Sequence, residues 1–169
     1  MILKAEAGDL PAIATLNYLA YRDMAARVPA WTSKEFFHSL VEKRAQHATF
    51  FLIRKNNKVV ASVAYGRPGS SVDPIPAPWA SVLLLAVHPD YQGNGLGRLL
   101  ARECISQAKQ DQAETVGLFT SELMTSAHRL YQRLGFKIEK ELAPRLGLRY
   151  WLYRYDILES IGAPLQNVE

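Results

Sequence analysis

The stretch VLLLAVHPDYQGNGLGRLL, residues 82–100, decides the fold class of this chain. It begins with an apolar run that ends near Val87, which is typical of a strand covered on both faces of a sheet. Three glycines, Gly93, Gly95 and Gly97, follow and lead into a helical pattern of leucines. A buried strand, a glycine turn and a helix start in this order are typical of an anion site, because the turn permits close approach and the helix start offers unpaired N–H groups.

Outward from this stretch, hydrophobic periodicity predicts strands and helices along the whole chain. We expect strands over residues 2–7, 49–54, 59–66, 79–87, 114–120, 136–142 and 149–157. We expect helices from an N-cap at Asp9 to Tyr21, from a capping box of Thr32 with Glu35, over 95–110 and over 126–134. The proline-rich segment 67–78 is predicted to be a loop, because proline removes backbone donors.

This order predicts an α/β fold, with a single mixed central sheet of about six to seven strands and helices on both faces. The length of 169 residues is typical of one domain, so we expect residues 1–169 to form a single domain. Cys104 is the only cysteine, which excludes an intrachain disulfide. No apolar run has the length of a membrane span, and the first residues lack a signal-peptide core. We therefore expect a cytoplasmic protein with no membrane partner.

The charge pattern and the spacing of the histidines bear on two kinds of partner, nucleic acids and metal ions. The net charge is +4, but no block of Lys and Arg interleaved with aromatic residues is present, so we expect no nucleic-acid partner. The four histidines and Cys104 show no metal-ligand spacing, so we expect no metal. We read Cys104 as a core residue on the apolar face of its helix.

Two widespread phosphate loops do not match the glycine turn. A P-loop needs Lys followed by Ser or Thr after the last glycine, where this chain has Arg98 and Leu99. A dinucleotide fingerprint needs glycine in place of Arg98, and it needs its glycines directly after the strand rather than five residues later. On these residues alone, a plain structural turn stays open as an alternative.

A resemblance to a known family resolves this choice. Residues 92–97, QGNGLG, match the Gln/Arg-x-x-Gly-x-Gly/Ala signature of the GCN5-related N-acetyltransferase (GNAT) superfamily. Residues 85–89, LAVHP, resemble the strand end before that signature, and residues 127–136, AHRLYQRLGF, resemble the family's Ala-x-x-Leu-Tyr-x-x-x-Gly-Phe segment. The resemblance is strong over residues 82–136, and elsewhere it lies only in the order of the elements.

The resemblance implies acetyl-CoA as cosubstrate and a bulged strand that splays from its parallel neighbour. Backbone groups of Leu85, Ala86 and Val87 would bind the pantetheine arm and the acetyl carbonyl, with an N–H near Val87 as the oxyanion donor. Tyr131 matches the family's tyrosine that acts as general acid on the departing thiolate. The diphosphate would bind backbone N–H groups of Gln92, Gly93, Asn94, Gly95, Leu96, Gly97 and Arg98.

The chain departs from the family pattern at two places. Met124 stands where many members carry an Asn that touches the pantetheine, and residues 81–84 lack the carboxylate that often serves as base. The base is therefore unassigned, with Glu122 and Glu35 as weak candidates. His128, one turn before Tyr131, is predicted to lie on the exposed flank of its helix.

We expect the acceptor to be a primary amine of a small molecule, bound near segments 18–37, 67–78 and 144–155, as the family implies. Two alternatives stay open. A non-catalytic acyl-CoA sensor or partner-binding module is suggested by Met124 and the missing strand carboxylate. An acetyltransferase of a protein N-terminus or an RNA-linked amine is suggested by the basic charge. Homodimers are common in the family, although no segment marks an interface.

Overall fold

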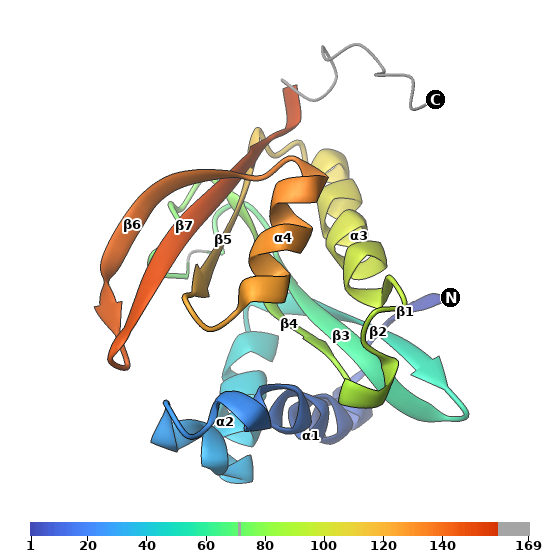
Figure 1. Cartoon of the computed structure of the whole chain (residues 1–169). Coiled ribbons are helices and arrows are strands. Elements are labelled where there is room, and N and C mark those ends of the chain that lie inside the picture. Colours follow the sequence, from blue (N-terminus) through green and yellow to red (C-terminus); the bar gives the residue numbers. More distant parts are fainter. Residues whose placement is uncertain (71, 159–169) are drawn as a thin grey trace, which may run out of the picture.

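A mixed seven-stranded sheet forms the centre of the computed structural model, which describes residues 1–70 and 72–158. The strands follow the order β1-β2-β3-β4-β5-β7-β6 (Figure 1). Their bounds are β1 Ile2–Lys4, β2 Ala48–Lys55, β3 Lys58–Gly66, β4 Ala80–Val87, β5 Thr115–Ser121, β6 Lys137–Arg145 and β7 Leu148–Asp156. Among the described strands, β4 and β5 alone pair in parallel. The predicted fold class, one mixed sheet with helices, is confirmed.

Helices cover both faces of the sheet (Figure 1). The first pair, α1 (Leu10–Tyr21) and α2 (Lys34–Ala45), packs on one face around Ile13 and Val41. The second pair, α3 (Leu96–Gln110) and α4 (Thr125–Leu134), packs on the other face around Leu100. Alternate residues of each central strand therefore enter two separate cores, as the period of two in a strand requires. No helix of the described residues is long and apolar enough to cross a membrane.

The start of α2 differs from the prediction. Ser33, rather than Thr32, is the N-cap, and its hydroxyl accepts a hydrogen bond from the Phe36 N–H at 3.2 Å. The Thr32 hydroxyl instead donates to the Pro29 carbonyl at 2.7 Å within a 3-10 turn, Pro29–Thr32. Thr32 and Ser33 are adjacent hydroxyl residues, and either could cap a helix. Thr32 is engaged in the turn that Pro29 begins, so Ser33 caps α2.

The N-terminal strand is also shorter than predicted. It ends at Lys4, because Ala7–Asp9 form a 3-10 turn before α1. Asp9 precedes α1 as expected, but its carboxylate accepts from the Glu6 N–H and pairs with Arg54 rather than capping the helix.

The predicted hairpin between β2 and β3 is present. Asn56 and Asn57 form its two-residue turn, with φ of 46° and 64°. Asn tolerates this left-handed region better than most residues, which is why the pair favours a tight hairpin. Segment 67–78 carries no helix or strand in its described residues, as predicted, and it leads into Trp79, the residue directly before β4.

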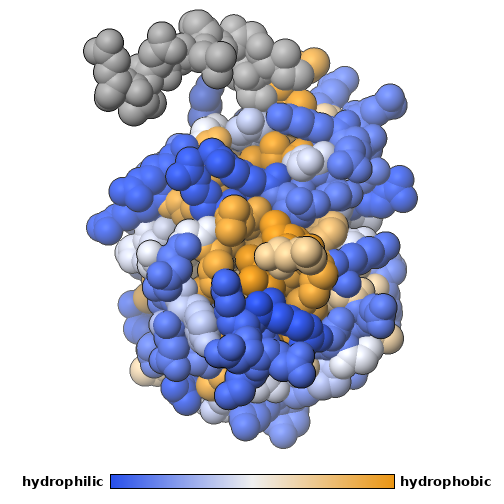
Figure 2. Space-filling view, turned by 90° about the vertical axis from the view of Figure 1, so that its right-hand side faces the viewer, coloured by the Kyte–Doolittle hydropathy of each residue, from blue (hydrophilic) through white to orange (hydrophobic). Residues whose placement is uncertain are grey.

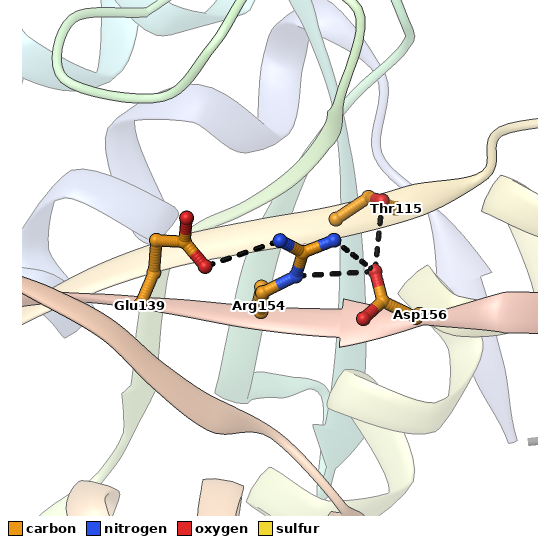
Figure 3. Close-up of polar contacts among 4 residues, drawn as sticks. All are labelled: Thr115, Glu139, Arg154 and Asp156. Atoms are coloured by element: carbon orange, nitrogen blue, oxygen red, sulfur yellow. Dashed lines mark hydrogen bonds and ion pairs between the residues drawn. The ribbon is translucent and has the colours of Figure 1, made fainter. Parts of the chain in front are cut away.

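A polar network joins the last three strands of the sheet (Figure 3). Arg154 of β7 donates to Asp156 at 2.7 Å and to Glu139 of β6 at 3.1 Å. The Thr115 hydroxyl of β5 donates to the same Asp156 oxygen at 3.0 Å. These charge-assisted bonds hold the pKa of Asp156 below its usual range. The network fixes the start of β5 against β7, beside the two residues of β5 that pair with β4.

Candidate active site

Strand β4 carries a bulge in the middle of its pairing with β3. The register shifts between Ser62 and Ala64, so two residues of β4, Leu84 and Leu85, stand opposite one residue of β3. Leu84 has a φ of 50°, in the left-handed region that non-glycine residues rarely enter. A bulge bends a strand and re-aims its backbone groups, and it is often found beside active sites.

Beyond the bulge, β4 and β5 separate. The parallel ladder between them holds only two residue pairs, at the start of β4. Further along, β4 continues to pair with β3 and β5 continues to pair with β7, so each strand follows a different partner. Leu85, Ala86 and Val87 lie on β4 past its last pair with β5. The Leu85 and Val87 carbonyls accept side-chain hydrogen bonds, so it is the N–H groups on that side that an extended ligand can pair with.

Tyr21, at the end of α1, anchors the bulge. Its hydroxyl donates to the Leu85 carbonyl at 2.8 Å, a contact between residues 64 positions apart. Its ring stacks on Phe37 at 5.9 Å and contacts Trp31 at 5.6 Å. Burial raises the pKa of Tyr21, and a charge on Tyr150 would raise it further, so the phenol keeps its proton. The sequence placed Tyr21 only in the acceptor region, because no local pattern reveals a contact with β4.

The glycine turn is braced from within by its own side chains. The Gln92 amide donates to the Val87 carbonyl at 3.2 Å, and the Asn94 amide donates to the Gln92 carbonyl at 3.3 Å. Gly93 and Gly95 have φ of 79° and 77°, and a Cβ on either would meet nothing within 4 Å. Backbone conformation, rather than crowding, therefore requires glycine here, and the space above the turn is open.

Helix α3 begins directly after this turn and packs closely against α4. The residues at its start, Leu96 to Arg98, contribute the first N–H groups of the helix, which have no intrahelical acceptor. A Cβ on Gly97 would lie 3.4 Å from the Leu130 side chain of α4 and 3.8 Å from Leu85 and Val87. Helices α3 and α4 and strand β4 thus meet at an apolar junction. Figure 2 faces the side of the molecule on which α3 lies and shows apolar side chains gathered within a hydrophilic rim.

This geometry fits acetyl-CoA in its two chemically distinct parts. The turn and the helix start present N–H groups and a partial positive charge to a diphosphate. The apolar junction beside the open edge of β4 suits the pantetheine arm, whose amides can pair with strand backbone. In this arrangement the thioester of acetyl-CoA would lie at the open edge of β4, and the protein would supply the hydrogen-bond donors around it.

Tyr131 lies on the inner face of α4 and is 6% exposed. Its ring packs edge-on against Phe136 at 5.6 Å. Burial raises the pKa of its phenol, and a charge on Tyr21 or Cys104 would raise it further. Tyr131 therefore holds its proton at physiological pH. Tyr131 belongs to the core cluster against which Leu85 and Val87 of β4 pack, so its ring lies on the side of the sheet that the bulge faces.

Cys104 is buried in this same core, as the sequence indicates. Burial raises the pKa of its thiol far above the ordinary value, so it stays protonated and unreactive. Among the described residues no group of three His, Cys, Asp or Glu side chains gathers as a metal ion would need.

The residues that depart from the family pattern have their own partners. The Met124 sulfur accepts a hydrogen bond from the Thr120 hydroxyl at 3.2 Å. Glu122 accepts from the Arg149 N–H at 3.1 Å and lies 3.7 Å from the Arg27 guanidinium. Glu35 is exposed at the start of α2, where hydrogen bonds from its own N–H and from the Ser33 hydroxyl lower its pKa. The lowered pKa of Glu35 is the opposite of the raised value that would mark a general base.

His128 differs from the prediction, because it faces inward. Its Nδ1 lies 2.6 Å from the Tyr153 hydroxyl and its Nε2 lies 2.9 Å from the Ser121 carbonyl. Its ring also contacts Trp151 at 5.6 Å. The amphipathic pattern of α4 alone did not reveal that β5 and β7 offer partners for both ring nitrogens. His128 thus fixes α4, and with it Tyr131, on the sheet.

Comparisons with known proteins agree with this geometry. The model of the acetyltransferase (GNAT) family matches residues 11–136. The mycothiol acetyltransferase of Thermobispora bispora is 27% identical over 128 residues, which cover 76% of this chain and 43% of that protein. The chain belongs to the GNAT acetyltransferase family.

Solved structures show the same fold. An N-acetyltransferase from Staphylococcus aureus Mu50 aligns with a TM-score of 0.72 at 21% identity, over 92% of this chain and 97% of that one. The acetyltransferase yncA of Salmonella typhimurium, solved with its cofactor acetyl-CoA, aligns with a TM-score of 0.70 at 20% identity, over 93% of each chain. The chain spans less than half the length of the curated relatives that it matches.

Proposed function

We propose that this protein is an N-acetyltransferase that moves the acetyl group of acetyl-CoA onto a primary amine of a small molecule. The observation that carries the proposal is that the bulged, open-edged strand β4 packs through Leu85 and Val87 against the core that holds the buried Tyr131. The glycine turn at the start of α3 supports it, because the turn leaves backbone N–H groups available for a diphosphate.

The proposed reaction is a direct attack of the neutral amine on the thioester carbonyl. The new C–N bond forms, the C–S bond breaks, and one proton leaves the amine for solvent. An N–H of β4 near Val87 stabilises the carbonyl oxygen as it gains negative charge. Tyr131 gives its proton to the departing sulfur and recovers it from solvent. The raised pKa means that Tyr131 still carries its proton when the thiolate departs.

A thiol-release assay with acetyl-CoA over a panel of small amines tests this function. We expect release with at least one primary amine, and we expect Tyr131→Phe to lower turnover at least tenfold while acetyl-CoA affinity changes little. Tyr65→Phe serves as the matched control, because it removes a buried phenol that is bonded to Asp111 outside the site. Equal turnover of wild type and Tyr131→Phe across pH would remove Tyr131 from the mechanism.

The same assay decides between the proposal and its alternatives. Binding of acetyl-CoA with no thiol release from any amine would support a sensor on this fold. Release only with a peptide N-terminus or an RNA-linked amine would support a macromolecular acceptor. The single-domain organisation of residues 1–169, the cytoplasmic location and any homodimer stay predictions drawn from the sequence and the family.

A further inference from the structure

A cavity of about 350 Å³ lies between α3, from its second turn to its end, and the last turn of α4. Strand β7 closes it through Tyr155, whose ring packs 5.3 Å from Phe136. The ring also lies within 3.3 Å of where a Cβ on Gly135 would be. Three of the residues that line the cavity are cations. The lining consists of Arg102, Ile105, Ser106, Lys109, Arg133, Leu134 and Tyr155.

The three cations have no carboxylate partner within residues 1–70 and 72–158, and no acidic side chain lines the cavity. The nearest acidic side chain along α3, Glu103, accepts a hydrogen bond from Gln107 at 2.8 Å. The three cations are solvent-exposed, so water and salt screen their mutual repulsion, and an anion that binds among them is attracted by all three.

Helix dipoles explain only part of this cluster. Lys109 and Arg133 lie in the last turns of α3 and α4, where a cation is favourable. Arg102 lies in the second turn of α3, too far from the C-terminal carbonyls for the helix dipole to stabilise its charge. Arg102, Ser106 and Lys109 follow the helical spacing of four and three residues, so they form one stripe that faces α4.

We propose that this cavity binds a phosphomonoester, through the side chains of Arg102, Lys109 and Arg133 with hydroxyl donors from Ser106 and Tyr155. A phosphate dianion is favoured over a carboxylate, because its three terminal oxygens can accept from two guanidinium forks and further donors at once.

A phosphomonoester that binds this cavity has two candidate sources. One is the 3′-phosphate on the ribose of the acetyl-CoA proposed above, and in that case the inference rests on the proposed function. Arg102 lies one helical turn, about 6 Å, beyond Arg98 in the first turn of α3, and one ribose separates the diphosphate from the 3′-phosphate of the cofactor. The other source is a free phosphorylated metabolite that binds independently of acetyl-CoA.

Titration calorimetry on the full chain separates the two sources. Acetyl-CoA and 3′-dephospho-acetyl-CoA are each titrated into wild type and into the double variant Arg102→Gln, Arg133→Gln. If the cofactor supplies the phosphate, wild type prefers acetyl-CoA about tenfold, and the double variant loses that preference while its affinity for the dephospho form is unchanged. Lys43→Gln is the matched control, because Lys43 is an exposed cation in the last turn of α2.

A titration with inorganic phosphate, followed by the amide spectra of α3 and α4, covers the second source. If a free metabolite supplies the phosphate, wild type binds both cofactor forms equally, and phosphate shifts the amides around the cavity in wild type but not in the double variant. The proposal is wrong if the variant matches wild type in both titrations while thermal melts show it folded. Thiol release by the double variant at saturating acetyl-CoA tests the proposed function separately. If release is retained, the acetyltransferase function stands regardless of the outcome of the two titrations.

Discussion

Tyr21 holds the bulge of β4 through one hydrogen bond to the Leu85 carbonyl, at 2.8 Å. The bulge forces Leu84 into the left-handed region, a conformation that persists only when its surroundings determine it. A single side chain therefore determines the conformation of the bulge. Phe37 and Trp31 hold the Tyr21 ring, and the Tyr21 hydroxyl holds the β4 backbone, so these side chains and β4 form one unit. Leu85, which Tyr21 holds, packs against the core cluster that contains Tyr131, so this unit also places β4 beside Tyr131.

Replacing Tyr21 with Phe tests this unit. Tyr21→Phe keeps the stacking on Phe37 and removes the hydrogen bond, so we expect a stability loss of about 1 kcal/mol and a turnover loss of about tenfold. Urea unfolding and the thiol-release assay measure the two effects. Tyr18→Phe is the control, because Tyr18 lies on the same helix and packs on the edge of Phe37 at 6.4 Å. Unchanged turnover in Tyr21→Phe would contradict a role for the bulge.

At the scale of elements, β5 is placed by contacts on both of its sides. The Trp79 ring lies over Gly117, where a Cβ would come within 2.7 Å of it and within 3.1 Å of Ile75. The Asp156 network ties the same strand to β7 and β6 (Figure 3). These contacts fix the strand from which β4 departs, and so they define the opening between the two.

Gly117→Ala is expected to destabilise the protein by about 1–3 kcal/mol, because the new methyl group has no room against Trp79. Denaturant unfolding measures the change in the free energy of unfolding. Gly8→Ala is the control, because a Cβ there meets nothing within 4 Å. Equal stability of Gly117→Ala and wild type would mean that Trp79 does not lie on β5 in solution.

The Asp156 network predicts a pH dependence of stability. The folded-state pKa of Asp156 lies below its unfolded value of about 3.9, so its contribution is present above that value and is lost as pH falls through the folded pKa. At neutral pH we expect Asp156→Asn to lower stability by at most about 1 kcal/mol, since Arg154 is partly exposed. Unfolding from pH 7 down to pH 3 should show the variant and wild type converging. A gap that stays constant with pH would contradict the assigned ion pair.

At the scale of the whole molecule, local patterns predict the sheet and its helices well, because period and turn chemistry are local properties. The Asn56–Asn57 hairpin and the α3 start at Leu96 follow from such signals. The contacts that define the site are long-range. Tyr21 reaches β4 and His128 reaches β7 through packing that no single segment encodes. The roles of Tyr131 and the glycine turn rest on the family motif, and they stay predictions.

The account depends most on the glycine turn, whose N–H groups should bind the diphosphate of acetyl-CoA. An amide-detected NMR titration of the full chain with acetyl-CoA tests this directly. We expect saturable binding, with the largest shifts at the amides of residues 92–98 and of the β4 edge from Leu85 to Val87. A folded protein whose amides in both segments stay unshifted at saturating acetyl-CoA would contradict the account.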